Sequence, residues 1–251
     1  MYRNTFLSVM FLACCFNGSL CAQSDAQIYE RTCDAKTYPF SDPSPVATPN
    51  NSYYPYFRFD GFSMQAQEKQ WKMVVLENDY VKLTVTPEIG GKIWGAIDKV
   101  NNKEFVYTNG VVKFRDVAMR GPWTSGGIEF NFGIIGHAPT CSTPIDYLTK
   151  KNVDGSVSCH IFSYEWITRT VWNVEINLPK DKAYFTTHTT WFNQSSIDQP
   201  YYQWMNAGYA TKTGTRFYYP GTYSIGHSGD LHPYPIDEEG RDVSWYDNNN
   251  F

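Results

Sequence analysis

The stretch from Arg115 to His137 has the residue types that could bind a polar ligand and transfer protons to it. It holds two arginines, a glutamate, an asparagine and a histidine among aromatic residues, and five glycines interrupt it. The core of a strand does not need these charges, whereas a binding cleft for a hydroxyl-rich ligand does. Glycines permit tight turns and close approach of the backbone. The stretch therefore predicts a site on loops that strands carry.

Two residues of this stretch, His137 and Glu129, are the candidates for acid–base chemistry. A histidine on a constrained loop titrates near neutrality, which suits proton transfer, although it could instead only bond the backbone. Strand alternation over Ile128–Phe132 places Glu129 and Asn131 on one face and the three apolar residues on the other. If the apolar face packs against the core, the polar pair faces a cleft. Alternatively, Glu129 and Asn131 lie on a solvated outer face.

Asn131 and five further residues are candidates for substrate binding. The guanidinium forks of Arg115 and Arg120 could bind an acidic sugar or a hydroxyl pair, or could equally pair with nearby acids and hold loops. Trp123 is either a stacking platform for a sugar ring or a buried anchor. Trp204 and Asn206 share one face of a later segment that alternates as a strand.

The elements that must position these residues are strands. Helical periodicity of any length is absent, and short turns separate the extended runs. An all-β fold, an antiparallel sandwich, is therefore expected. Strand signals recur in Trp71–Leu76, Tyr80–Thr86, Lys92–Asp98, Glu104–Tyr107, Ser156–Trp172, Val174–Leu178, Ala183–Asn193, Tyr201–Ala210 and Arg216–Tyr219.

The N-terminal region divides into two segments before the expected domain at 57–251. Residues 1–22 have the charge pattern and the short apolar run of a secretory signal, which predicts a secreted or periplasmic protein. A lipoprotein anchor is less favoured, because Cys21 follows a leucine. Residues 23–56 are rich in proline and read as an extended leader. The tail from Glu238 onwards ends without a terminating element. This fits a fragment of a longer protein, and it also fits a flexible natural terminus.

Composition excludes several function classes. With 21 basic and 25 acidic residues, the chain has no basic footprint for nucleic acid. No later apolar run is long enough to span a membrane. Beyond the signal the cysteines are Cys33, Cys141 and Cys159, which match no zinc spacing but allow one bridge, for instance Cys141–Cys159. We expect no metal and no cofactor, and the sequence does not indicate an oligomeric state.

Three segments resemble a known family of secreted bacterial proteins, the domain of unknown function 5107. They are Thr86–Lys99 (TPEIGGKIWGAIDK), Val111–Thr140 and Tyr201–Ala210 (YYQWMNAGYA). The resemblance runs from about Tyr53 to the last residue. Longer members carry downstream tetratricopeptide repeats, which this chain lacks; this departure implies that the domain at 57–251 is truncated at its C-terminus.

The resemblance implies a galactose mutarotase-like β-supersandwich and a saccharide ligand. In such domains a histidine and a glutamate act as acid and base, which implies those roles for His137 and Glu129. Trp204 and Asn206 resemble a second sugar contact. The expected function is therefore carbohydrate-active; the alternatives are a noncatalytic carbohydrate-binding module and a scaffold domain of a larger repeat protein.

Overall fold

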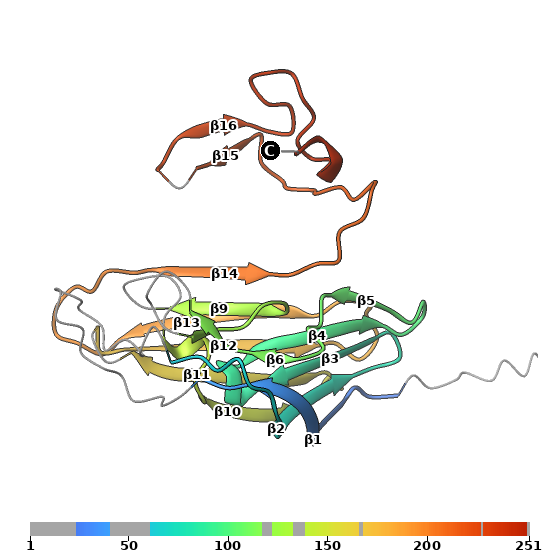
Figure 1. Ribbon diagram of the computed structural model, residues 1–251, viewed down its shortest axis with the longest axis vertical. Coiled ribbons are helices and arrows are strands. Elements are labelled where there is room, and N and C mark those ends of the chain that lie inside the picture. The colour runs from blue at the N-terminus through green and yellow to red at the C-terminus, as the bar shows by residue number, and fades with distance from the viewer. Residues whose placement is uncertain are drawn as a thin grey trace, which may run out of the picture.

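Two β-sheets stacked face to face form the body of the molecule (Figure 1). The computed structural model describes residues 24–40, 61–116, 122–132, 139–165, 168–226 and 228–249. In these ranges the helices are short 3-10 turns, and none of them could cross a lipid bilayer. The expected all-β, largely antiparallel sandwich is confirmed.

The larger sheet has eight strands, in the spatial order β14-β9-β4-β3-β2-β1-β6 with β5 beside β4. Strand β4 shares one edge between two partners, β9 near its start and β5 near its end. All pairings are antiparallel except β1 with β6. The strands are β1 (Gln27–Tyr38), β2 (Gln67–Glu77), β3 (Val81–Thr86), β4 (Lys92–Asp98), β5 (Lys103–Val106), β6 (Val112–Lys113), β9 (Ile128–Phe132) and β14 (Gln203–Ala207).

The smaller sheet has four antiparallel strands in chain order, β10 to β13. Two separate strand pairs, β7 with β8 and β15 with β16, lie outside both sheets. These strands are β10 (Asp146–Lys151), β11 (Val157–Glu165), β12 (Thr170–Leu178), β13 (Thr186–Asn193), β7 (Arg115–Asp116), β8 (Pro122–Trp123), β15 (Tyr223–Ile225) and β16 (Leu231–Pro233). The 3-10 turns are η1 (Pro87–Ile89), η2 (Pro139–Cys141) and η3 (Tyr246–Asn248).

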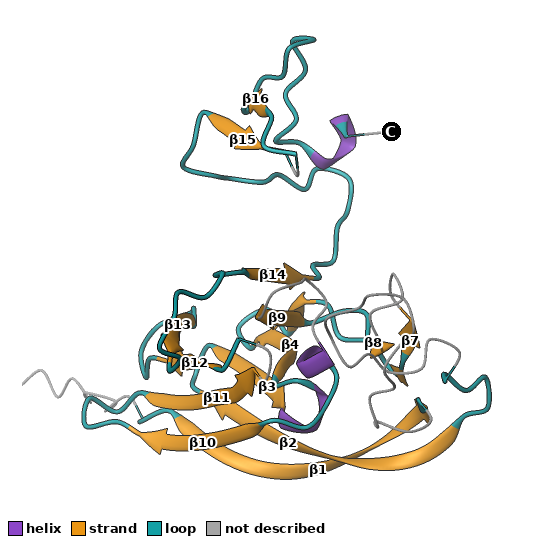
Figure 2. Cartoon of the chain, turned by 90° about the vertical axis from the view of Figure 1, so that its left-hand side faces the viewer, coloured by secondary structure: helices purple, strands orange, loops and turns teal. Residues whose placement is uncertain are grey.

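The main core fills the space between the two sheets. Alternate residues of β2, β3, β4 and β9 meet those of β11 and β12, and Phe132 stacks on Trp172 with ring centroids 4.6 Å apart. A second apolar cluster lies on the opposite face of the larger sheet, which we call the outer face. It consists of Trp71, Met73, Ile89, Trp94, Val112 and Phe114. Figure 2 shows 3-10 turns, in purple, beside the strands of the larger sheet.

The sequence-based boundaries differ from the structure at three places. Residues 27–37 of the expected leader pair with β2, and Tyr38 pairs with β6, so this part belongs to the sheet. The expected strand Ser156–Trp172 is two strands, β11 and part of β12. Segment 216–219 is not a strand; Arg216 forms an isolated bridge with Trp245. The expected signal peptide, residues 1–22, lies outside the described residues.

The C-terminal residues form a small unit apart from the sandwich, although a single domain was expected over 57–251. We call residues 212–226 and 228–249 the arm; it rises beyond β14 in Figures 1 and 2. Its ends are joined by backbone bonds from Phe217 N–H to the Ser244 carbonyl (2.7 Å) and from Tyr246 N–H to the Thr215 carbonyl (2.9 Å).

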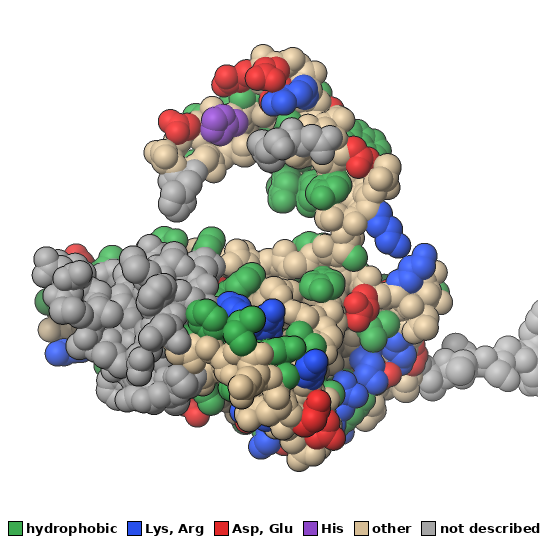
Figure 3. Space-filling model, viewed as in Figure 1, with side chains coloured by type: hydrophobic (Ala, Val, Ile, Leu, Met, Phe, Trp, Pro, Cys, Tyr) green, Lys and Arg blue, Asp and Glu red, His purple; other side chains and the backbone are tan. Residues whose placement is uncertain are grey.

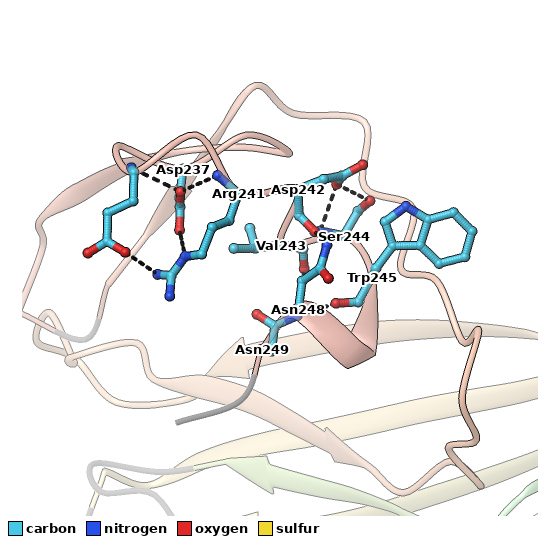
Figure 4. Close-up of polar contacts among 9 residues, drawn as sticks. Asp237, Arg241, Asp242, Val243, Ser244, Trp245, Asn248 and Asn249 are labelled. Atoms are coloured by element: carbon cyan, nitrogen blue, oxygen red, sulfur yellow. Dashed lines mark hydrogen bonds and ion pairs between the residues drawn. The ribbon is translucent and has the colours of Figure 1, made fainter.

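Side-chain bonds within a turn and the segment after it stabilise the arm further (Figure 4). The Asp237 carboxylate accepts backbone bonds from Glu239 and Arg241 and pairs with the Arg241 guanidinium at 2.8 Å. The arm is therefore held together by local hydrogen bonds rather than by an apolar core.

Candidate functional site

Strand β9 has the two faces that its alternation predicts. Ile128, Phe130 and Phe132 lie in the main core, and Glu129 and Asn131 point to the outer face. Gly127, just before the strand, has φ +67° and no room for a side chain, since a Cβ would lie 2.3 Å from the Ile93 carbonyl oxygen. This close approach brings the start of β9 against β4.

Lys92 at the start of β4 is the partner of Glu129. Ile93 pairs with Ile128, so the preceding and following residues, Lys92 and Glu129, meet across the two strands. The Lys92 Nζ lies 3.7 Å from Glu129 Oε2, and the two side chains are 1% and 2% exposed. A buried carboxylate and a buried ammonium have large desolvation costs, which each offsets for the other.

Two neighbours complete what we call the polar cluster: Lys92, Glu129, Thr124 and Asn131. Lys92 donates to the Thr124 carbonyl and, at 3.0 Å, to the Thr124 hydroxyl. Asn131 Nδ2 donates to Glu129 Oε1 at 2.8 Å. The cluster is thus a hydrogen-bonded network around one ion pair, almost completely excluded from solvent.

Burial also changes the proton affinities near the cluster. Burial lowers the pKa of Lys92, and the negative charge of Glu129 opposes that change. The pKa of the Cys141 thiol is raised far above its usual range by burial and by Glu129. Low local polarity therefore makes Lys92 a stronger acid, and Cys141 a weaker one, than the same groups are in water.

Strand β14 brings two more of the predicted residues to the same face. In the register of β9 and β14, Trp204 lies opposite Asn131 and Asn206 opposite Glu129. Directly opposite residues of antiparallel strands share a face of the sheet. Both β14 side chains are half-buried. They form an accessible rim beside the buried cluster.

Trp123 is close to the cluster as well. Its ring centroid lies 6.0 Å from the Lys92 Nζ, and the side chain is half-buried. Of the eight residues proposed for the site from sequence, the structure gathers five around the outer face of β9: Trp123, Glu129, Asn131, Trp204 and Asn206.

Arg115 has a different environment. It pairs with Trp123 between β7 and β8, but its guanidinium donates to the carbonyls of Phe114 (2.6 Å) and Ser63 (3.3 Å). The same group lies 5.0 Å from the ring centroid of Phe62. These contacts hold neighbouring loops. Arg120 and His137 lie outside the described residues, and their predicted roles stay predictions.

Sequence reasoning missed Lys92 and Thr124. Lys92 follows Gly90-Gly91 at the head of an apolar strand, and such a strand rarely begins with an ammonium on a buried position. A glutamate flanked by isoleucine and phenylalanine also requires a cationic or hydrogen-bonding partner. Together these two anomalies could have suggested the pair.

Two cavities of about 260 Å³ each open beside the second apolar cluster on the outer face. Trp71, Phe114, Lys69 and Glu88 line the first. Trp94, Met73, Arg31, Lys82 and Thr108 are among the residues that line the second. Neither includes Glu129 or Asn131, whose side chains are buried.

In the part of the chain that the structure describes, the cysteines and acidic residues form no further centre. Cys33, Cys141 and Cys159 form no disulfide, so the bridge between Cys141 and Cys159 that the sequence allowed is not formed. In the described ranges no group of three or more His, Cys, Asp or Glu side chains could hold a metal ion.

Comparison with known proteins gives the chain a family and a fold relative. A solved TPR-domain containing protein from Parabacteroides distasonis ATCC 8503 superposes with a TM-score of 0.71 at 26% sequence identity. The match covers 80% of this chain and 35% of that one, so the chain spans about a third of the length of this relative. The family model described as "Domain of unknown function (DUF5107)" matches residues 48–251. Because the match covers most of the sequence, the chain belongs to the DUF5107 family.

Proposed function

We propose that this protein is carbohydrate-active and binds a saccharide on the outer face of the larger sheet. The observation that carries the proposal is the β9–β14 register, which sets Trp204 beside Asn131 and Asn206 beside Glu129. A sugar presents hydroxyl groups and an apolar ring face. An indole next to amides and a carboxylate is a surface that can bind both.

The accessible residues decide where a ligand makes its first contacts. Trp204, Asn206 and Trp123 are half-buried, whereas Glu129 is 1% exposed. A saccharide can therefore bind at the rim without any change in the cluster. A saccharide can contact Glu129 only if the groups that bury this side chain move away from it.

Acid–base chemistry on the bound sugar is a second candidate, favoured by the buried Lys92–Glu129 pair. Buried ionisable groups with specific charge partners are common at reactive sites. In the proposed reaction Glu129 takes the proton of the anomeric hydroxyl while Lys92 gives one to the ring oxygen, which opens the ring. The reverse transfers close it to the other anomer.

Cleavage of a glycosidic bond fits the cluster less well. It requires two suitably spaced carboxyl groups in most enzymes. The ionisable groups that act on Lys92 are Glu129 and the Cys141 thiol, so the described part of the cluster supplies one carboxylate and one amine. Exchange between anomers needs no more than this.

Binding is tested by calorimetry with neutral and acidic mono- and oligosaccharides. Trp204→Ala and Asn206→Ala should each weaken binding by about tenfold or more, the scale of a lost central contact. Asn173→Ala, on β12 of the other sheet, is the matched control and should bind as the unaltered protein does. If the folded unaltered protein binds no saccharide, the proposal fails and the scaffold alternative is left.

Catalysis is tested by NMR measurement of anomer exchange with each saccharide that binds. Under conditions where circular dichroism shows that Glu129→Gln is folded, this variant should lower the rate by roughly 10²-fold or more, as for loss of a general base, while the calorimetric affinity survives. Binding without any acceleration by the unaltered protein would instead identify a noncatalytic carbohydrate-binding module.

A further inference from the structure

The second cavity on the outer face is enclosed by five strands and one loop. Residues of β1 to β4 form its floor and two of its sides, β5 contributes one residue, and the segment 108–112 forms a third side. All of the lining residues lie between Arg31 and Val112. The cavity is therefore a separate feature from the rim at β14.

A close contact with β4 holds the loop that forms the third side. A Cβ on Gly95 would lie 2.0 Å from the Thr108 hydroxyl oxygen, so only glycine lets Thr108 lie against this strand. Asn109 donates to the Ser125 hydroxyl at 2.7 Å, and its side-chain oxygen accepts a bond from the Val111 backbone at 3.3 Å. These contacts fix the loop beside the cavity.

The floor of the cavity is largely apolar and includes an indole. Trp94 and Met73 belong to the second apolar cluster and are 6% and 3% exposed. Thr84 and Ile97 extend the floor and are half-buried. An aromatic side chain beside polar groups can pack against the apolar face of a sugar ring and leave the ring hydroxyls to the polar groups.

Charged side chains surround this floor. Arg31 pairs with Met73, and Ile97 pairs with both Lys82 and Glu104, so these three charges share the outer face with the floor. Asp34 also lines the cavity. It alternates with the outer-face residues of β1, however, and its carboxylate accepts a bond from Gln70 at 3.3 Å.

Positive charge exceeds negative charge around the cavity. Glu77 lies 3.3 Å from Lys82 and 2.8 Å from Lys99, so two ammonium groups share this one carboxylate. Arg31 is exposed at the side of the cavity, and Glu104 is the other acid on this face. Figure 3 shows Lys and Arg side chains next to hydrophobic and acidic ones over the right-hand part of the sandwich, where Figure 1 labels β3, β4 and β5. The surroundings therefore favour a ligand with one negative charge.

We propose that the second cavity binds a hexuronic acid unit, with its carboxylate on Arg31, its ring against Trp94 and its hydroxyls on Glu104 and Thr108. A guanidinium fork can hold a carboxylate through two parallel hydrogen bonds. The volume of about 260 Å³ is below the roughly 300–1,000 Å³ that is typical of sites for drug-sized ligands, and it suits a single ring. The proposal takes the saccharide class from the proposed function and adds a second subsite and a charge to it.

The first test compares each acid with its neutral counterpart by calorimetry: glucuronate with glucose, and galacturonate with galactose. The unaltered protein should bind at least one hexuronate more tightly than the matching hexose. Arg31→Gln should weaken hexuronate binding by about tenfold or more and remove this preference. Lys36→Gln is the control, because Lys36 is an equally exposed class of cation on the opposite face of β1, and it should leave both affinities unchanged.

A chemical measurement locates the bound ligand. Cys33 lines the cavity and is half-buried, so a bound ring should slow the alkylation of its thiol by iodoacetamide. The preferred hexuronate should protect Cys33 in the unaltered protein, and the same concentration should protect it less in Arg31→Gln. A saccharide at the rim of β14 would not cover this thiol.

Trp204→Ala distinguishes this proposal from saccharide binding at the rim. It should leave both the affinity for the hexuronate and the protection of Cys33 unchanged. If Trp204→Ala weakens saccharide binding and Arg31→Gln has no effect, the rim is the binding site and the second cavity is not. If only Arg31→Gln has an effect, the second cavity is the site and the proposal for the rim fails.

Two results would overturn the hexuronate site: equal affinity for every acid and its neutral hexose, or a Cys33 thiol that reacts at the same rate with and without saturating hexuronate. Circular dichroism checks the fold of each variant. The protection of Cys33 in the unaltered protein requires no substitution, so it decides the matter even if Arg31→Gln does not fold.

Discussion

Lys92 and Glu129 form an ion pair across β4 and β9 with a nitrogen–oxygen distance of 3.7 Å, and neither side chain is more than 2% exposed. The pair lies on the outer face, on the opposite side of the sheet from the main core. The ion pair is therefore not part of the core between the two sheets. Thr124 accepts a hydrogen bond from Lys92, and Asn131 donates one to Glu129. These bonds replace hydrogen bonds to water that both charged groups lose on burial.

Removal of one partner of this pair should destabilise the fold strongly. Lys92→Met keeps most of the volume but leaves the Glu129 carboxylate buried without a cation. A loss of about 3–5 kcal/mol in the free energy of unfolding is expected, measured by urea titration. Lys72→Met is the control, because its ion pair with Glu30 is long (4.0 Å) and half-exposed, and it should cost less than about 1 kcal/mol.

Removal of both charges should recover part of that loss. In the double variant Lys92→Met, Glu129→Gln no charge remains buried in the pair, so its stability should exceed that of Lys92→Met by about 1 kcal/mol or more. The double-mutant cycle in urea gives the coupling. Additive losses would show that the two side chains do not interact as the distance indicates.

Glu77 should make a measurable part of stability depend on acid pH. Partial burial raises its pKa, but bonds from Lys99 (2.8 Å) and Tyr29 (3.0 Å) outweigh that effect, and the net shift is downward from 4.5. A carboxyl whose folded pKa is lowered adds stability above its unfolded pKa and loses it as pH falls through the folded value. This contribution is therefore present at pH 7 and disappears below pH 4.5.

The matched variant for this effect is Glu77→Gln, compared with the unaltered protein by urea unfolding at pH 7 and at pH 3. At neutral pH the variant should be less stable by about 1 kcal/mol, the scale of a partly exposed charged hydrogen bond. At pH 3 the difference should shrink. A difference that stays constant with pH would mean that the charge of Glu77 is not the cause.

Local periodicity explains how much of this fold could be predicted. Alternation over Ile128–Phe132 gave the correct two faces, because the period of a strand is fixed by its backbone. It could not show that the polar face is covered, since burial depends on residues far away in sequence. The same limit applies to Arg216–Tyr219, whose extended pattern is compatible with a strand but finds no strand partner.

The site was predictable only in part for a related reason. Glu129 and Asn131 lie on one strand, so their shared face can be read from the sequence. Their relation to Trp204 and Asn206 depends on the pairing of β9 with β14, more than 70 residues later. Lys92 is about 35 residues earlier, and no local pattern links it to Glu129.

Arg115 should contribute to loop structure rather than to ligand affinity. Its guanidinium is engaged by the Phe114 and Ser63 carbonyls and lies on the Phe62 ring. Arg115→Met should therefore lower the free energy of unfolding by about 1–2 kcal/mol and leave saccharide affinity within about twofold. Calorimetry beside urea titration checks both. A large loss of affinity with unchanged stability would show that Arg115 contributes to saccharide binding.

The three described cysteines should differ sharply in their reaction with iodoacetamide. Cys141 is 2% exposed and Cys159 fully buried, and burial raises the pKa of the Cys159 thiol to about 12, whereas Cys33 is half-buried beside the second cavity. Because the thiolate is the nucleophile, alkylation in the folded protein should modify Cys33 first. Peptide mass spectrometry before and after addition of urea measures this order. If Cys141 reacted as fast as Cys33 without denaturant, the cover over the polar cluster would have to open readily, and Glu129 would then be within reach of a bound saccharide.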